Sequence, residues 1–289
     1  MKKPTVAVLG TGAMGSRMVK QLLKAEFPVV VYNRSRDRLR TLEVDGATVV
    51  GSPREAARRS QVVISMVTDD KASREVWLDS EVGAAEGLQK DAIAIESSTV
   101  TPGWVRELGG KIEEAGARYL AAPVVGSRPQ ADAGGLIYLV GGAAATLAAA
   151  KEVLQAMGST IHHIGGPGDA ATMKLAVNAL FGCQVAVLAE VVGLIGRAGI
   201  DVKNALSIMA SMPVSSPAMQ AVGAQIVARS FAPLFPVKLV EKDFCYLEET
   251  ARALAAELPA CSAVGEVYAS AHRKGLGGEN ISGIVRLYQ

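Results

Sequence analysis

The sequence has few cysteines and histidines. Its three cysteines, Cys183, Cys245 and Cys261, lie far apart, form no CxxC pair and are odd in number. This pattern argues against a disulfide framework and against a zinc site built from cysteine pairs. The chain also has only three histidines, with no acidic cluster at ligand spacing beside them, so we expect no metal site. Such cysteine usage is typical of a reducing cytoplasm, which is the expected location.

Net charge is also small, and no long apolar segment stands near the start. Thirty basic and 28 acidic residues leave a formal charge of +2, which excludes an overall field that attracts nucleic acid or an anionic membrane. The apolar run Thr5 to Leu9 stops at Gly10, so it is too short for a signal peptide or an anchor. We therefore expect a soluble protein that binds neither nucleic acid nor membrane.

What the sequence does contain is an alternation of β-branched runs and helical segments in its first half. With 289 residues, 49% of them hydrophobic, the chain is long enough for two domains. Repeated βα units predict an α/β Rossmann domain with a doubly wound, mainly parallel sheet over residues 1–165, followed by an all-helical domain over residues 166–289. The predicted strands are 4–9, 28–32, 47–50, 61–67 and 91–98, with helical segments such as 35–43 and 52–59 between them.

A GxGxxG motif lies between the first predicted strand and the first predicted helix. Its first glycine permits a tight turn, its second lets the backbone approach a pyrophosphate, and its third allows close packing of helix and strand. The helix start offers unpaired N–H groups to the phosphates. The alternative is an ordinary glycine turn, but strand, turn and helix stand in the order that a dinucleotide site requires. Candidate cofactor contacts here are Gly10, Gly12, Ala13, Met14 and Gly15.

Ligands of such sheets bind at the carboxyl ends of the strands. This rule adds candidate contacts after the second, fourth and fifth predicted strands, namely Asn33, Arg34, Ser35, Met66, Val67, Thr68, Ser98 and Thr99.

The residue after the second strand indicates which nicotinamide cofactor is bound. NAD enzymes usually have Asp or Glu there to bind the ribose hydroxyls, but this chain has Asn33 followed by Arg34. A carboxylate would repel a 2′-phosphate, whereas arginine can bind it through charge-assisted hydrogen bonds. We therefore expect NADPH or NADP, with NAD disfavoured. The alternative is that the arginines between positions 34 and 40 form a solvated, basic start of a helix.

Residues 169–199 predict one long helix that is apolar nearly all round, which indicates burial on every side. Such a helix commonly lies between domains or subunits, and we expect a homodimer or homotetramer. Lys174 and Asn178 are four positions apart on this helix and project from one face. A lysine ammonium can stabilise a developing alkoxide and protonate it, while asparagine can hold the amine or the substrate oxygen. The alternative is a lysine that snorkels from the helix start.

Together these motifs resemble the β-hydroxyacid dehydrogenases, which include 3-hydroxyisobutyrate dehydrogenase, tartronate semialdehyde reductase and the glyoxylate/succinic semialdehyde reductases. The resemblance spans essentially the whole chain and follows the family's order. It rests on the GxGxxG motif, Ser98-Thr99, the segment Ala122 to Ser127, Lys174 with Asn178, and Lys242-Asp243.

The resemblance implies a role for each matching residue. Lys174 matches the family's catalytic lysine, Asn178 its supporting asparagine, and Lys242 its second active-site lysine. The implied cofactor contacts are Ser98, Thr99 and Lys242. The implied substrate contacts are Ser98, Pro123, Val124, Val125, Gly126, Ser127, Lys174, Asn178, Lys242 and Asp243.

Two residues depart from the family's substrate loop. Ala121 replaces the usual acid, and Val125 replaces a serine that helps relatives bind the substrate carboxylate. Backbone N–H groups of the glycine-containing loop can still bind an anion, and the Ser127 hydroxyl could substitute for the lost one. The retained Lys174 counts against the imine-reducing and the non-catalytic chromatin-associated relatives, which lack it.

The sequence therefore predicts an NADPH-dependent oxidoreductase that interconverts a small aldehyde or keto acid and its hydroxy acid by hydride transfer. A 3-hydroxyacid dehydrogenase that works in the oxidative direction is the near alternative, and a non-enzymatic dinucleotide-binding protein is the alternative of another class. A 6-phosphogluconate dehydrogenase is disfavoured, because its helical domain is much larger than residues 166–289 could provide.

Overall fold

The computed structural model describes residues 3–289 and divides into two compact units. The first unit ends at Lys174, and the second covers Leu175–Gln289. This division falls inside one continuous helix, α8 (Pro167–Arg197).

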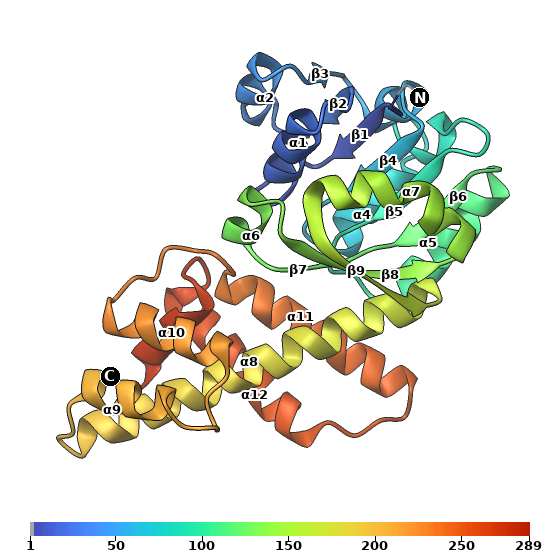
Figure 1. The fold of residues 1–289 in the computed structure, drawn as a ribbon. Helices are drawn as coiled ribbons and strands as arrows, with labels where there is room; N and C mark the ends of the chain where they lie inside the picture. Colours follow the sequence, from blue (N-terminus) through green and yellow to red (C-terminus); the bar gives the residue numbers. More distant parts are fainter. Residues whose placement is uncertain (1–2) are drawn as a thin grey trace. The chain divides into compact units, whose positions relative to one another are not determined.

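A mainly parallel β-sheet forms the centre of the first unit (Figure 1). Its strands follow the order β3, β2, β1, β4, β5, β6, β8, β7, with β9 also paired to β8. The pairs from β3 to β6 are parallel, whereas β8 runs antiparallel to β6 and β7. This order of the first six strands is that of a Rossmann sheet, so the predicted fold is confirmed. The strands are β1 (Val6–Leu9), β2 (Val29–Tyr32), β3 (Thr48–Val49), β4 (Val62–Ser65), β5 (Ile93–Glu96), β6 (Arg118–Ala121), β7 (Val124–Val125), β8 (Leu136–Gly142) and β9 (Gly158–Gly165).

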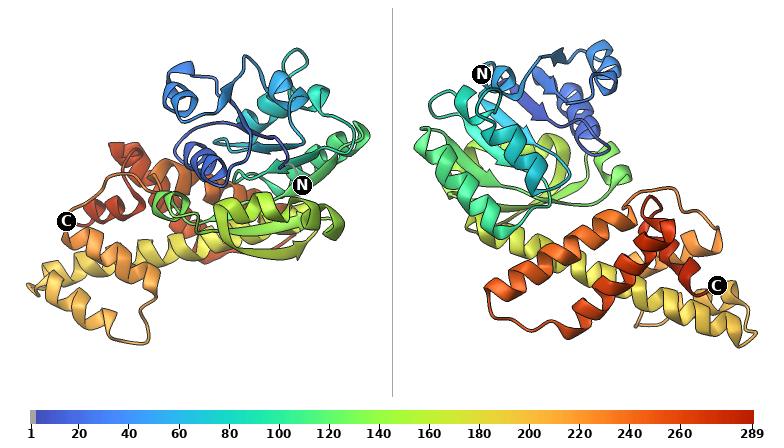
Figure 2. Two further views of the ribbon diagram at one scale, coloured as in Figure 1. Left: turned by 45° about the horizontal axis from the view of Figure 1, so that its top comes forward. Right: turned by 180° about the vertical axis from the view of Figure 1, so that it is seen from behind.

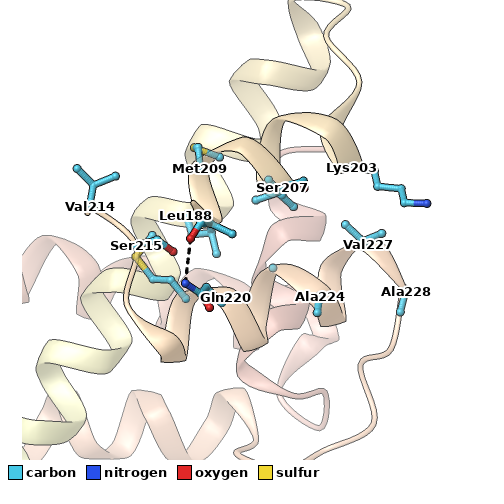
Figure 3. A pocket seen from close by; sticks show the side chains of 14 residues that line it. Leu188, Lys203, Ser207, Met209, Val214, Ser215, Gln220, Ala224, Val227 and Ala228 are labelled. Carbon is cyan, nitrogen blue, oxygen red and sulfur yellow. Dashed lines mark hydrogen bonds between the residues drawn. The ribbon is translucent and has the colours of Figure 1, made fainter. Parts of the chain in front are cut away.

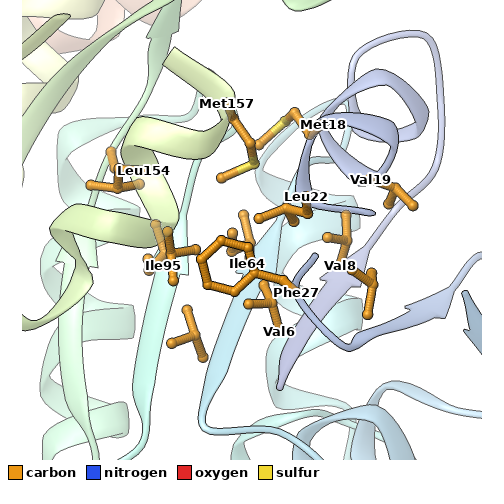
Figure 4. Close-up of a cluster of buried hydrophobic side chains, with 14 of the residues drawn as sticks. Val6, Val8, Met18, Val19, Leu22, Phe27, Ile64, Ile95, Leu154 and Met157 are labelled. Carbon is orange, nitrogen blue, oxygen red and sulfur yellow. The ribbon is translucent and has the colours of Figure 1, made fainter. Parts of the chain in front are cut away.

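Helices cover both faces of this sheet (Figures 1 and 2), because successive strand residues point to opposite faces. Val6 and Val8 pack with Met18 and Leu22 of α1 on one face (Figure 4), whereas Ala7 and Leu9 belong to the core on the other face. The helices of this unit are α1 (Gly15–Lys24), α2 (Arg40–Val44), α3 (Pro53–Arg58), α4 (Asp70–Leu78), α5 (Pro102–Glu114), α6 (Arg128–Asp132) and α7 (Ala144–Met157), with short 3-10 turns η1 (Arg36–Arg38) and η2 (Ala85–Gly87).

The second unit, residues 175–289, is built from helices joined by short loops, with no named strand among its residues. Leu175, Val185 and Val192 of α8 pack in its core with residues of the other helices, such as Phe244 and Tyr268. After α8 come α9 (Val202–Ala210), α10 (Pro217–Val227), α11 (Val237–Ala253), α12 (Pro259–Ala271), a π-helical turn η3 (His272–Leu276) and the 3-10 segment η4 (Ile281–Leu287).

Helix α8 has one apolar face that the described chain leaves uncovered. Burial on every side was expected, but Leu180, Val187 and Leu194 are 66%, 53% and 69% exposed. These three leucine and valine positions recur every seven residues, so they share one face of the helix. Burial of this face would need a second copy of the chain, so burial on every side stays a prediction.

By length and composition, α8 is also the one helix within residues 3–289 that could cross a membrane. In its most apolar window, 44% of the residues are buried inside the protein. A core helix of a globular unit passes the same test, so this finding is weak support for a membrane span.

Candidate active site

A tight turn follows β1 at the carboxyl edge of the sheet. Gly10 has a φ of +94° there, a conformation that residues with a Cβ rarely adopt. A Cβ on Gly10 would lie 2.5 Å from the carbonyl oxygen of Met66, and a Cβ on Gly15 would lie 2.0 Å from the carbonyl oxygen of Gly10. Both distances are too short for a side chain. The turn therefore packs directly against the segment after β4 and against the start of α1.

This turn fits a dinucleotide pyrophosphate. The first N–H groups of a helix have no acceptor within the helix and favour anions. Gly12 and Met14 are partly exposed and Ala13 is exposed, so the backbone at the start of α1 is accessible. Within this described helix the first turn of α1 has no acidic residue, and its Arg17 is ion-paired with Asp132 at 2.9 Å. The side-chain-free glycine turn thus leaves room for a phosphate beside a helix start of suitable charge.

The end of β2 is tied to the glycine turn by an amide side chain. Asn33 Oδ1 accepts a hydrogen bond from the Thr11 N–H at 3.0 Å, and Asn33 Nδ2 donates to the Ser35 carbonyl oxygen at 3.0 Å. The Arg34 side chain is 88% exposed, with Glu75 at 3.9 Å as its ion-pair partner. Asn33 therefore orients the turn, and Arg34 remains accessible to a ligand. Arg36 and Arg40 are exposed, whereas the side chain of Arg38 lies outside the described residues.

The segments after β4 and β5 are joined through Ser98. Its hydroxyl oxygen accepts a hydrogen bond from the Val67 N–H at 2.8 Å, and its own N–H donates to Glu96 Oε1 at 2.9 Å. Ser98 is 2% exposed, while Met66, Val67 and Thr99 are half-buried and Thr68 is exposed. The Ser98 side chain is therefore part of the scaffold beneath the predicted site.

The segment that resembles the family's substrate loop lies between β6 and α6. Val124 is buried and Val125 is half-buried, and both pair with β8. The Leu139 N–H donates to the Pro123 carbonyl oxygen at 3.0 Å. Gly126 follows, exposed and with a φ of +122°. The loop is thus held at its start by strand pairing and reaches the surface at its glycine.

Ser127 and Arg128 close this loop. Ser127 forms a capping box with Gln130 at the start of α6, in which the Ser127 N–H donates to Gln130 Oε1 at 3.0 Å. Its hydroxyl takes part in this cap, so the cap competes with the expected role of Ser127 in substrate binding. Arg128 is half-buried, and within residues 3–289 its enclosed Nε has no hydrogen-bond acceptor. Arg128 was not among the predicted site residues.

Lys174 and Asn178 lie one turn apart on α8 and are only 7% and 8% exposed. A lysine this deeply buried is unusual, because removing an ammonium from water is costly unless it is paired or functional. The snorkelling alternative would leave the amine end in water, so burial favours the functional interpretation.

Asp243 of α11 contacts two other predicted site residues of the second unit. Asn178 Nδ2 donates to Asp243 Oδ2 at 2.6 Å, and Lys242 Nζ lies 3.1 Å from Asp243 Oδ1. The Lys242 ammonium also lies 4.7 Å from the centre of the Tyr246 ring. Asp243 is 5% exposed, so the ion pair is poorly screened by water. The structure thus brings together three residues that the sequence placed in one site.

Sequence reasoning missed the buried carboxyl of Glu96 at the end of β5. Glu96 is 0% exposed and is bonded by Ser73, Trp77 and Ser98. Burial raises the pKa of Glu96, and these hydrogen bonds oppose that rise. An acid two residues before the predicted Ser98 contact was a signal in the sequence, but its partners on α4 could not be inferred.

The predicted residues thus form two sets, each within one unit. The first unit contains the glycine turn, the strand-end segments, the loop from Ala121 to Ser127 and, as its last residue, Lys174. The second unit contains Asn178, Lys242 and Asp243. Within residues 3–289, no cluster of His, Cys, Asp or Glu side chains could hold a metal ion.

A groove of about 370 Å³ in the second unit is separate from these residues (Figure 3). It lies among α8, α9 and α10 and is lined mostly by apolar side chains, including Leu188, Met209 and Val214. It contains none of the predicted site residues.

Both units match models of known protein families. Residues 5–165 match the family model described as the NAD binding domain of 6-phosphogluconate dehydrogenase. Residues 168–288 match the model described as NAD-binding of NADP-dependent 3-hydroxyisobutyrate dehydrogenase.

Individual relatives match over the whole chain. The mitochondrial 3-hydroxyisobutyrate dehydrogenase of Drosophila melanogaster is 31% identical over 284 residues, which is 96% of this chain and 87% of that protein. The chloroplastic glyoxylate/succinic semialdehyde reductase 2 of Arabidopsis thaliana is 28% identical over 281 residues, which is 97% of this chain and 78% of that protein. A solved structure of Mycobacterium tuberculosis 3-hydroxyisobutyrate dehydrogenase with L-serine has 25% identity and a TM-score of 0.90, and the match covers 99% of each chain. The chain therefore belongs to the β-hydroxyacid dehydrogenase family and is an NAD(P)-dependent oxidoreductase that acts on hydroxyl and carbonyl groups.

Proposed function

We propose that this enzyme reduces a small aldehyde acid with NADPH and that Lys174 donates the proton. The observation that carries the proposal is the deep burial of Lys174 one helical turn before Asn178, which is itself bonded to Asp243. The substrate class follows the Arabidopsis relative, which is named for glyoxylate and succinic semialdehyde. Oxidation of a 3-hydroxy acid, the activity named for the Drosophila relative, is the second candidate.

The glycine turn, the Asn33 segment and the segments 66–68 and 98–99 would hold the dinucleotide. When bound, the reduced nicotinamide supplies the hydride. The glycines leave space for the pyrophosphate, and N–H groups at the start of α1 would bind it. Asn33 keeps the turn in position through its bond to the Thr11 N–H.

NADPH is favoured over NADH by the residues at the end of β2. The Asn33 side chain is neutral, and both of its polar atoms are hydrogen-bonded within the protein. This position therefore lacks the carboxylate with which NAD enzymes bind the ribose hydroxyls. Arg34 is exposed, and its contact with Glu75 is long at 3.9 Å. An exposed pair of this kind contributes little, so the guanidinium can turn to a 2′-phosphate at small cost.

Lys174 would donate a proton to the carbonyl oxygen as negative charge develops on it. A buried ammonium stabilises such charge more strongly than one in water. The bond from Asn178 Nδ2 to Asp243 fixes the amide orientation, because only its nitrogen can donate to a carboxylate. The amide oxygen is then the acceptor, suited to orienting the amine or a substrate hydroxyl.

The substrate carboxylate requires an anion-binding group, because Val125 has no hydroxyl and Ser127 caps α6. Arg128 follows directly and is half-buried, so part of this residue remains accessible to a ligand. A guanidinium can bind a carboxylate through two parallel hydrogen bonds. We therefore assign Arg128, with the backbone of Gly126, to the substrate carboxylate.

We also propose a cytoplasmic homodimer or homotetramer. The exposed apolar residues Leu180, Val187 and Leu194 on one face of α8 support association, because such a face is stabilised when a second copy covers it.

Replacing Lys174 with alanine should abolish most turnover while leaving NADPH binding intact. We expect kcat to fall by about two to four orders of magnitude, because the developing alkoxide loses its proton donor. Stopped-flow kinetics would measure kcat, and fluorescence titration would measure NADPH binding. Lys151 is an exposed residue of α7, so Lys151→Ala serves as the control and should keep normal turnover. Turnover near the normal rate in Lys174→Ala would disprove the assignment.

Replacing Arg34 with alanine should weaken NADPH use selectively. We expect the KM for NADPH to rise about tenfold, the effect of losing one charge-assisted hydrogen bond, while the KM for NADH changes little. Steady-state kinetics with both cofactors would measure this difference, with the exposed Arg58→Ala as control. A wild-type enzyme that uses NADH and NADPH equally well would contradict the preference.

Replacing Arg128 with alanine should impair substrates that carry a carboxylate. We expect their KM to rise about tenfold or more, because an ionic hydrogen bond is lost, whereas neutral aldehydes should be reduced as before. Arg118→Ala is the matched control, since Arg118 is the first residue of β6 and so lies at the amino ends of the parallel strands, away from the predicted site. Equal effects on charged and neutral substrates would remove Arg128 from the substrate site.

A further inference from the structure

Glu96 ends β5 with a fully buried carboxyl group whose two oxygens have different partners. Oε2 accepts hydrogen bonds from the Ser73 hydroxyl at 2.5 Å and from Trp77 Nε1 at 2.9 Å, both on α4. Oε1 accepts from the Ser98 N–H at 2.9 Å. The side chain of Ser98 is a further hydrogen-bond partner of the carboxyl group. Oε2 thus bonds to helix α4, and Oε1 bonds to the segment after β5 that contains the predicted cofactor contacts Ser98 and Thr99.

The contacts on the α4 side continue into the core of the first unit. Ser73 Oγ accepts a hydrogen bond from Trp104 Nε1 of α5 at 2.8 Å. Trp77 and Trp104 are 0% and 1% exposed. Their indole N–H groups need acceptors when buried, and the carboxyl and the hydroxyl provide them. Glu96 is therefore anchored directly by α4, and α4 is bonded in turn to α5; neither helix contributes predicted cofactor contacts.

The contacts on the other side reach the glycine turn. Ser98 Oγ accepts from the Val67 N–H at 2.8 Å. The main chain of Met66 and the side chain of Val67 lie 2.5 Å and 2.9 Å from the position that a Cβ on Gly10 would occupy. Glu96, Ser98, Val67 and Gly10 thus form a continuous series of contacts along the carboxyl ends of β5, β4 and β1.

We propose that Glu96 is a positioning residue for the dinucleotide site, which acts by fixing the backbone of Ser98 and, through the Ser98 hydroxyl, that of Val67. This inference rests on the proposed function, because it gives these segments a role in cofactor binding. It also changes the role of Ser98. Its hydroxyl joins the two strand-end segments, and its contribution to the ligand is the placement of the backbone and of neighbouring Thr99.

A carboxyl group is required because acceptors are needed at both oxygens. Glutamine has the same shape but only one oxygen. In Glu96→Gln, an N–H group would face either the Ser98 N–H or the two donors on α4. Aspartate keeps both acceptor oxygens but is one methylene shorter. It can therefore accept hydrogen bonds on both sides, but at longer distances from the donors.

The test compares the effect of losing hydrogen bonds to α4 with the effect of losing the hydrogen bond to Ser98. Glu96→Gln, Glu96→Asp and the control Ser73→Ala would be compared for Tm, for NADPH affinity by fluorescence titration, and for KM and kcat. Ser73→Ala removes a donor on the α4 side alone and lies outside the predicted cofactor contacts. We expect all three variants to lower Tm. NADPH binding should weaken about tenfold in Glu96→Gln. It should weaken by a smaller but measurable factor in Glu96→Asp, and by less than about twofold in Ser73→Ala.

A double-mutant cycle with Ser98→Ala keeps the proposal testable if Glu96→Gln folds poorly. Because Glu96 acts through Ser98, the losses of NADPH affinity in Glu96→Asp and Ser98→Ala should not add. Additive losses, unchanged affinity in Glu96→Gln, or an equal loss in Ser73→Ala would overturn the positioning role. Wild-type protein that binds NADPH but reduces no carbonyl compound would contradict the proposed function and leave the role of Glu96 standing.

Discussion

The first unit depends on a constraint at the carboxyl edge of its sheet, where the backbone after β1 must pass with no side chain between itself and the segment after β4. Gly10 adopts a positive φ and lies against Met66, and Gly15 lies against Gly10. A Cβ on Gly10 would force the segments after β1 and β4 apart, and a Cβ on Gly15 would push α1 away from the turn. The same close packing leaves the start of α1 open to a phosphate, so one geometric requirement serves both the fold and cofactor binding.

Polar side chains at this edge stabilise the backbone as well as offering groups to ligands. Asn33 holds the glycine turn through the Thr11 N–H, and Ser98 holds the Val67 N–H. The second unit follows the same principle, since Asp243 orients Asn178 and pairs with Lys242. Buried polar groups that are held by hydrogen bonds or ion pairs keep defined orientations, which is the preorganisation that hydride and proton transfer require.

The sequence predicted the features that depend on local pattern. Short β-branched runs and the glycine turn were sufficient for the Rossmann sheet, and the spacing of Lys174 and Asn178 placed them on one face of a helix. Features that depend on tertiary packing could not be predicted from the sequence. The partners of Glu96 lie on α4 and could be known only from the fold, and the exposure of Leu180 on α8 depends on which face the rest of the chain covers.

The central claim is that this enzyme transfers a hydride from NADPH to the carbonyl carbon of a small aldehyde acid. The most direct measurement uses NADPH deuterated at C4 of the nicotinamide, with glyoxylate or succinic semialdehyde as substrate and mass spectrometry of the hydroxy acid formed. The account predicts one carbon-bound deuterium per product molecule with one of the two C4-labelled forms of NADPH, and none with the other. A hydroxy acid without carbon-bound deuterium from either form, or no hydroxy acid at all, would contradict it.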